Sequence, residues 1–114
     1  MLIEALLLGT LTVTSYQAIP SQTDSSPGWT AIGDKTTKFG VAVSQDMLKD
    51  GRIKYGDVLL IDGYGLRVVN DCMNARHKNR IDLLVFSHAE EKRVGTRHLR
   101  VWRIKNELSK LSKR

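Results

Sequence analysis

The residues most able to do chemistry in this chain are three aspartates, Asp24, Asp71 and Asp82. Asp71 closes one apolar stretch and Asp82 opens the next, whereas Asp24 lies in a turn-rich segment between two prolines. A partly desolvated carboxylate near a second carboxylate has a raised pKa, so it can keep a proton near neutral pH and act as a general acid. The alternative is structural: Asp71 and Asp82 accept backbone N–H groups of their connection and pair with Arg76 and Arg80.

The sequence gives weaker signals for a metal site or for nucleic-acid binding. The three histidines, His77, His88 and His98, match no metal-ligand spacing, and the single cysteine excludes a cysteine cluster, so we expect no metal and no other cofactor. Basic residues are frequent, but aromatic residues make up only 6% of the chain and no nucleic-acid-binding motif is present. Nucleic acid is therefore not the expected partner.

The length and charge limit the class of protein. A chain of 114 residues can bury one core and forms one domain. Its formal net charge of +6 favours an anionic partner, such as nucleic acid, an anionic lipid surface or the carboxylate-rich bacterial cell wall.

The elements that must position the aspartates are mostly strands. Period-two alternation and β-branched residues predict six of them, at residues 11–18, 39–44, 58–61, 66–69, 81–87 and 98–104. The Asp-Gly pair at 62–63 predicts a hairpin. Two short helices are expected, one after Ser44 that ends at Gly51, and one with Ser87 and Glu90 as a capping box. Six strands with short helices predict an all-β barrel.

The two ends of the chain differ from the barrel region. Residues 1–11 form an apolar segment, either an opening strand or an arm that packs on a partner. This segment lacks the basic start of an ordinary signal peptide and is too short to cross a bilayer, so no transmembrane span is expected. Residues 12–104 carry the predicted strands, and residues 105–114 predict a basic C-terminal helix.

Several motifs together resemble a known family. They are D-x-M-N-x-R-x-x-x-R-I-D, T-D-S-x-P, and the segments "SYQAIPSQTDSSPGWTAIGDK", "GVAVSQDML", "IKYGDVLLIDGYGLRVVNDCMNARHKNRID" and "GTRHLRVWRI". The chain resembles the bacterial three-aspartate (3D) domain over residues 12–104. That domain is a double-psi β-barrel related to the barrel of membrane-bound lytic transglycosylase A and to stationary-phase survival muralytic proteins. The resemblance implies a six-stranded double-psi β-barrel with short helices.

The resemblance also implies an activity. The family cleaves the β-1,4 bond between N-acetylmuramic acid and N-acetylglucosamine in peptidoglycan, without attack by water. It implies that Asp82 is the general acid and base, that Asp71 orients it or stabilises positive charge on the sugar, and that Asp24 shapes the cleft. The implied substrate-binding residues are Thr23, Ser25, Thr30, Asn74, His77 and Arg80.

The expected partner is thus the glycan strand of peptidoglycan, and the expected place is the cell envelope, the periplasm or a virion. One departure from the family supports an alternative. Where transglycosylase-type relatives carry two glycines, this chain has Met73 and Asn74. Glycine lets the backbone approach a ligand closely. The alternative is a non-catalytic cell-wall glycan-binding protein, or a phage virion structural component with virion or cell-envelope proteins as partners, that uses the same barrel.

Overall fold

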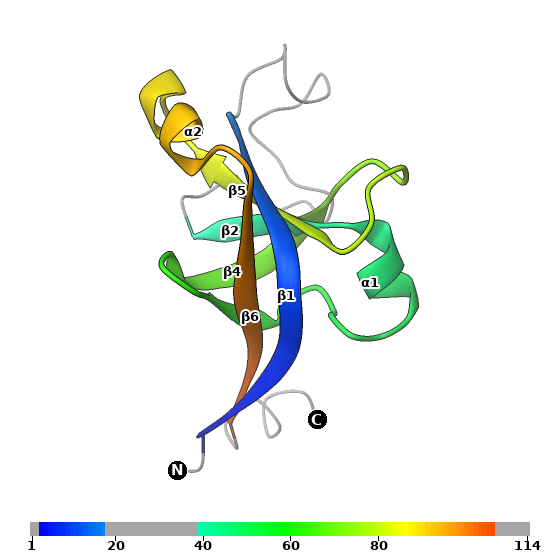
Figure 1. Cartoon of the computed structure of the whole chain (residues 1–114). Coiled ribbons are helices and arrows are strands. Elements are labelled where there is room, and N and C mark those ends of the chain that lie inside the picture. The colour runs from blue at the N-terminus through cyan, green and yellow to red at the C-terminus, as the bar shows by residue number, and fades with distance from the viewer. Residues whose placement is uncertain (1–2, 18–38, 107–114) are drawn as a thin grey trace.

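The computed structural model describes residues 3–17 and 39–106, which fold into a closed barrel with two short helices (Figure 1). The six described strands lie in the order β1-β5-β2-β4-β3-β6 around the barrel. Their bounds are β1 Ile3–Gln17, β2 Gly40–Val43, β3 Val58–Ile61, β4 Gly65–Cys72, β5 Arg80–Val85 and β6 Arg97–Asn106. The prediction of an all-β, six-stranded barrel with short helices is confirmed.

Two of the six strand pairings are parallel. β1 pairs with β5 and β2 pairs with β4 in parallel, and the other four pairings are antiparallel. Parallel neighbours cannot be joined by a tight hairpin, so longer connections must cross the ends of the barrel.

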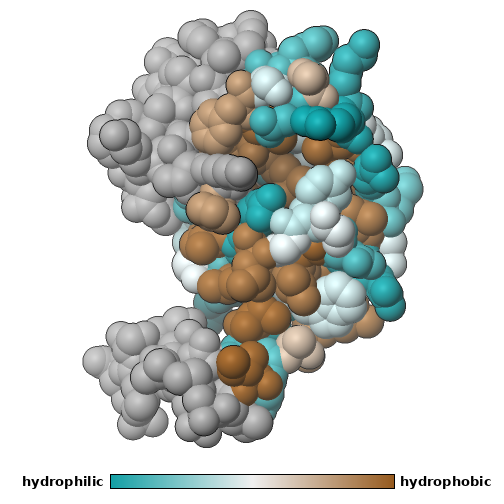
Figure 2. Space-filling model, turned by 90° about the vertical axis from the view of Figure 1, so that its left-hand side faces the viewer, coloured by the Kyte–Doolittle hydropathy of each residue, from teal (hydrophilic) through white to brown (hydrophobic). Residues whose placement is uncertain are grey.

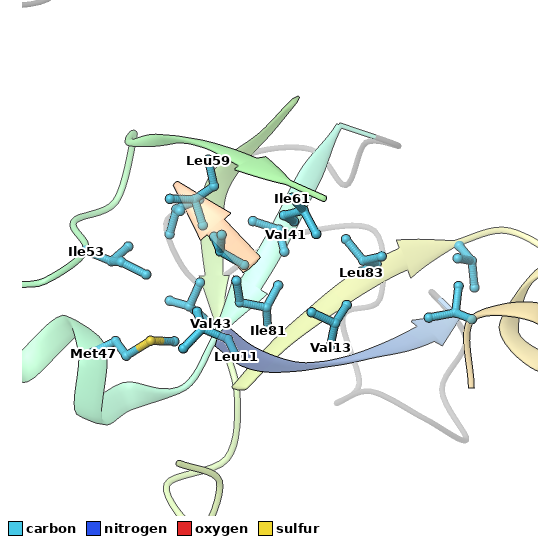
Figure 3. Close-up of a cluster of buried hydrophobic side chains, with 14 residues drawn as sticks. Leu11, Val13, Val41, Val43, Met47, Ile53, Leu59, Ile61, Ile81 and Leu83 are labelled. Atoms are coloured by element: carbon cyan, nitrogen blue, oxygen red, sulfur yellow. The ribbon is translucent and has the colours of Figure 1, made fainter. Parts of the chain in front are cut away.

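Alternate residues of the strands fill the interior. Their apolar side chains, together with those of Met47, Ile53 and Val94 from outside the strands, form one buried cluster, drawn in Figure 3. Its members are Leu11, Val13, Val41, Val43, Met47, Ile53, Leu59, Ile61, Val69, Ile81, Leu83, Val85, Val94 and Val101. Because successive side chains of a strand point to opposite faces, the residues between these positions lie on the outside of the barrel.

The strand predictions differ from the structure mainly in length. β3 has the predicted bounds, and β3 and β4 form the predicted hairpin, with Ile61 opposite Gly65. β1 starts at Ile3, so the described part of the apolar N-terminal segment is strand, paired with the end of β6. β4 continues to Cys72, and the connection to β5 is therefore shorter than the sequence suggested.

Both helices lie where they were predicted. α1 spans Gln45–Lys49 and is followed by Gly51 at a φ of 83°, a left-handed conformation that favours glycine. α2 spans His88–Val94, and the Ser87 hydroxyl accepts the Glu90 N–H at 3.1 Å. Ser44 stands at the N-cap position of α1 without a side-chain cap bond.

The predicted C-terminal helix at 105–114 is only partly covered by the described residues. Residues 105 and 106 belong to β6, and residues 107–114 lie outside the described residues. Within 3–17 and 39–106, no helix has the length and hydrophobicity needed to span a membrane.

Candidate functional site

The strand register places Asp71 and Asp82 on the same outer face of the barrel. Both aspartates are register partners of Ala42, Asp71 on β4 and Asp82 on β5, with β2 between them. The neighbours of Ala42 on β2, Val41 and Val43, point into the core. Two strand spacings separate the two aspartate backbones, which corresponds to roughly 10 Å. The two carboxylates therefore face the same side across a single small residue.

A β-bulge in β4 gives Asp71 this orientation. Val41 pairs with Val69 and Ala42 pairs with Asp71, so Asn70 is an extra residue in β4. In a regular strand Asp71, two residues after the buried Val69, would lie on the same face as Val69 and point into the core. Bulges re-aim side chains in this way and are frequent next to functional sites.

Gly40 makes room for the bulge. The Asn70 side chain is buried, and a Cβ atom built on Gly40 would lie 2.5 Å from Asn70 Nδ2. A real Cβ atom does not approach another heavy atom so closely. Glycine at position 40 is therefore part of the arrangement that positions Asp71.

Asp82 is half-buried and accepts a hydrogen bond from a neighbouring strand. The Thr14 hydroxyl on β1 donates to Asp82 Oδ1 at 2.9 Å. Burial raises the pKa of Asp82 from 3.8 to about 6, and the charges of Glu91 and Asp71 add to the rise. The hydrogen bond from Thr14 and the charge of Arg80 oppose it. A carboxyl group with this pKa still holds a proton in part of the population near neutral pH.

The structural alternative for the aspartates holds in part for Asp71. Its Oδ1 accepts the backbone N–H of Cys72 at 2.9 Å, as a capping carboxylate would. Asp82 instead accepts a side-chain hydroxyl, and no described arginine forms an ion pair with it. The two aspartates therefore differ in their surroundings, and Asp82 is the one with the acid-like environment.

Two tyrosines were not identified from the sequence. Tyr16 lies two residues after Thr14 on the same face of β1, and its register partner is Leu84, two residues after Asp82. Burial and the charges of Asp71 and Asp82 raise the pKa of Tyr16. Burial, a hydrogen bond with Cys72 and the charges of Cys72 and Asp71 raise the pKa of Tyr55. The period-two alternation of the sequence predicts that Tyr16 and Thr14 share one face of β1. Only the parallel pairing of β1 with β5 places that face near the aspartates.

The connection between the aspartate-bearing strands spans residues 73–79 and crosses the end of β2. Its first residue, Met73, donates its N–H to the Val43 carbonyl at 2.9 Å. At its far end, Arg80 donates its N–H to Ser44 Oγ at 3.0 Å, and Arg80 O accepts the Ser44 N–H. Gln45 of α1 also donates to the Met73 carbonyl. The junction of β2 and α1 thus fixes both ends of the connection.

The predicted substrate-binding residues in this connection have partners within the chain. The Asn74 side-chain oxygen accepts the Arg76 N–H at 3.1 Å, and Asn74 is exposed. His77 Nδ1 lies 3.3 Å from the guanidinium of Arg80, which shares the face of Asp82 on β5. Burial and the charges of Arg80 and Arg76 lower the pKa of His77, which favours the neutral form of its ring.

The other predicted site residues are not covered by the described structure. Asp24, Thr23, Ser25 and Thr30 lie outside the described residues. The described site therefore consists of Asp71 and Asp82 together with Thr14, Tyr16 and Arg80.

The histidines lie in separate places and do not suggest a metal centre. His77 is in the connection 73–79, His88 begins α2, and His98 lies on β6 beside Thr12. Within the described part of the chain, no three His, Cys, Asp or Glu side chains gather so that they could hold a metal ion.

The site combines one carboxyl group of raised pKa, a second carboxylate on the same face, and Tyr16, whose pKa is raised by burial and by the charges of both carboxylates. Such a set can donate a proton to a leaving oxygen and stabilise nearby positive charge. The chain matches no protein-family model and no curated protein sequence.

Proposed function

We propose that the protein cleaves peptidoglycan as a lytic transglycosylase-like enzyme, with Asp82 as general acid and base. Its substrate would be the β-1,4 bond between N-acetylmuramic acid and N-acetylglucosamine. The observation that carries the proposal is the environment of Asp82. Burial raises its pKa to about 6, and it shares an outer face with Asp71.

The reaction needs one proton donor that later becomes a proton acceptor. Protonated Asp82 would give its proton to the glycosidic oxygen, and the bond from that oxygen to C1 of the muramyl sugar would break. The Asp82 carboxylate would then take the proton of the muramyl 6-hydroxyl, whose oxygen bonds to C1 and closes a 1,6-anhydro ring. Asp82 therefore ends protonated, as it began, and it needs no proton from solvent before the next cleavage.

Asp71 would stabilise positive charge on the sugar and would not transfer a proton. Positive charge develops on the sugar ring as the glycosidic bond breaks. A carboxylate on the same barrel face stabilises that charge, and it also raises the pKa of Asp82. In ordinary glycoside hydrolysis a second carboxylate attacks the sugar or activates water. Here the muramyl hydroxyl takes that role.

The test is digestion of purified sacculi. The natural protein should release 1,6-anhydromuropeptides, and Asp82→Asn should release none, because an amide cannot donate the proton. Asp62→Asn is a matched control, since Asp62 lies in the β3–β4 turn and pairs with Arg100. Equal product profiles from the natural protein and Asp82→Asn would contradict the proposal.

A second candidate is a catalytically silent module that binds cell-wall glycan or another polyanion through the same face. The exposed cationic side chains of Arg76 and Lys78, in the connection next to the aspartates, favour it. Retention of the protein on sacculi without soluble products, unchanged by Asp82→Asn, would support binding alone. A place in the cell envelope or in a virion fits both candidates.

A further inference from the structure

The outer face on the other side of the barrel is apolar. Strands β1, β6, β3 and β4 are neighbours, and their outward residues stand opposite one another. One row across these strands consists of Leu7, Trp102, Leu60 and Leu66. The next row consists of Ala5, Ile104, Val58 and Val68, and Ile3 follows on β1. These nine residues are called the apolar face below.

Much of the apolar face is open to solvent. Ile3 is 64% exposed, Leu7 54%, Leu66 55% and Val68 39%. β4 lies toward the left-hand side of Figure 1, which faces the viewer in Figure 2, and hydrophobic residues gather there across the middle of the described surface. Single exposed apolar residues are normal, but a contiguous set over four strands marks an interaction site.

The apolar face carries no charged side chain among its nine residues, although the chain has a net charge of +6. One charged residue at its border, Arg100, lies over the Trp102 ring at 5.3 Å and pairs with Asp62 at 3.4 Å. A surface that binds anionic lipid needs unpaired cations beside its apolar residues. The cation beside Trp102 is instead paired with a carboxylate, which favours a neutral and apolar partner surface there.

We propose that the apolar face binds the same face of a second copy of the chain. A two-fold interface brings a surface against itself, and an uncharged face can do so without opposing like charges. The nine residues expose on the order of 600 Å², the upper size of the largest patch on a monomer. Two copies would bury about 1,200 Å² in total, which reaches the lower limit of specific interfaces.

The geometry of the face suits this contact. Two sheets pack face to face at about 10 Å when both inner faces are apolar. Trp102 and Leu60 lie in the middle strands, where binding energy concentrates, and tryptophan is frequent at such positions. The aspartate pair lies across β2, a strand that does not contribute to the apolar face.

The experiment measures the mass of the full chain in solution by sedimentation over a range of concentrations. The natural protein should sediment at twice the 12.8 kDa chain mass. Leu7→Glu and Leu66→Glu should each weaken the dimer by at least about tenfold, because each places a charge in the contact. Both residues are about half exposed in the single chain, so the fold should tolerate the change.

Leu6→Glu is the matched control. Leu6 is the neighbour of Leu7, is 49% exposed, and stands opposite Arg103 on the other face of the same strand. It should leave the dimer intact. A natural protein that stays monomeric up to about 1 mM would overturn the proposal. So would equal effects of Leu6→Glu and Leu7→Glu, or a monomer that sediments with anionic vesicles.

Discussion

Asp82 is the residue on which the proposed chemistry depends. Its carboxyl group is largely removed from water, and a single hydroxyl, that of Thr14, donates to its Oδ1. Burial of a carboxyl group favours the neutral form, whereas a hydrogen bond to the carboxylate and the charge of Arg80 favour the ionised form. Burial is the larger effect, and it leaves the pKa of Asp82 at about 6.

This pKa predicts a pH dependence of stability. Between 3.8 and about 6 the folded chain keeps a proton on Asp82 that the unfolded chain has lost. The contribution is fully present below pH 3.8 and is lost as pH rises through 6, on the order of 2–3 kcal/mol in the free energy of unfolding. Asp82→Asn should lack this loss and should be more stable than the natural protein at pH 7.

Urea unfolding at several pH values between 4 and 7 checks this prediction. The difference in unfolding free energy between Asp82→Asn and the natural protein should grow with pH. Asp62→Asn should follow the natural protein, because Asp62 is exposed and lies in a turn. A constant difference between Asp82→Asn and the natural protein would show that Asp82 has an ordinary pKa.

Thr14 should lower the pKa of Asp82 through its hydrogen bond. Its hydroxyl stabilises the ionised form of Asp82, so Thr14→Val should raise the pKa of Asp82 further, by about one unit. If the protein cleaves sacculi, the pH above which cleavage declines should move upward by a similar amount. Thr14→Ser keeps the hydroxyl and should leave the pH profile in place. An unchanged pH profile in Thr14→Val would show that the hydrogen bond from Thr14 does not affect the pKa of the catalytic acid.

At the residue scale, the sequence identified candidate site residues but not the residues that surround them in the fold. Asp71 and Asp82 stood out because each borders an apolar strand. Thr14 and Tyr16 did not, because they join the site only through the parallel pairing of β1 with β5. That pairing joins residues that are 68 positions apart, and no local pattern encodes it.

At the scale of elements, the bulge in β4 decides which way Asp71 points. Asn70 is the extra residue of β4, and Asp71 regains the register opposite Ala42. The hairpin of β3 and β4 could be predicted, because Asp-Gly at 62–63 is a strong turn signal. The bulge could not, because one extra residue, Asn70 between Val69 and Asp71, leaves no mark in composition or period.

Gly40→Ala tests the bulge. The new Cβ atom would meet the buried Asn70 amide at 2.5 Å, so either the amide or the bulge must shift. We expect a loss of about 1–3 kcal/mol in unfolding free energy and a fall in any activity that needs Asp71. The double variant Gly40→Ala with Asn70→Ala should recover stability, because the clash is gone. Additive losses in the double variant would exclude the clash as the cause.

At the scale of the whole molecule, the barrel separates two outer faces. Asp71 on β4 and Asp82 on β5 flank β2, and the apolar face lies over β1, β6, β3 and β4. The barrel itself could be predicted from six alternating strands, whereas the order of the strands could not. Since that order decides which residues share a face, both faces became visible only in the structure.

Because one buried cluster holds the barrel together, truncating a residue of that cluster should destabilise the whole fold. Leu59 on β3 is fully buried, between Arg67 and Arg103 in the strand register. Leu59→Ala should lower the unfolding free energy by about 2–5 kcal/mol in urea titrations. Leu6→Ala, at a half-exposed position, should cost far less. Similar losses in both variants would contradict the described position of the core.

The measurement that tests the central claim most directly is a carboxyl-carbon NMR titration of the full chain, with the Asp82 signal assigned by its absence in Asp82→Asn. A midpoint near pH 6 is predicted, because the buried carboxyl group holds its proton beside a second carboxylate. A midpoint below about pH 4, the range of an ordinary aspartate, would contradict the assignment of Asp82 as the acid.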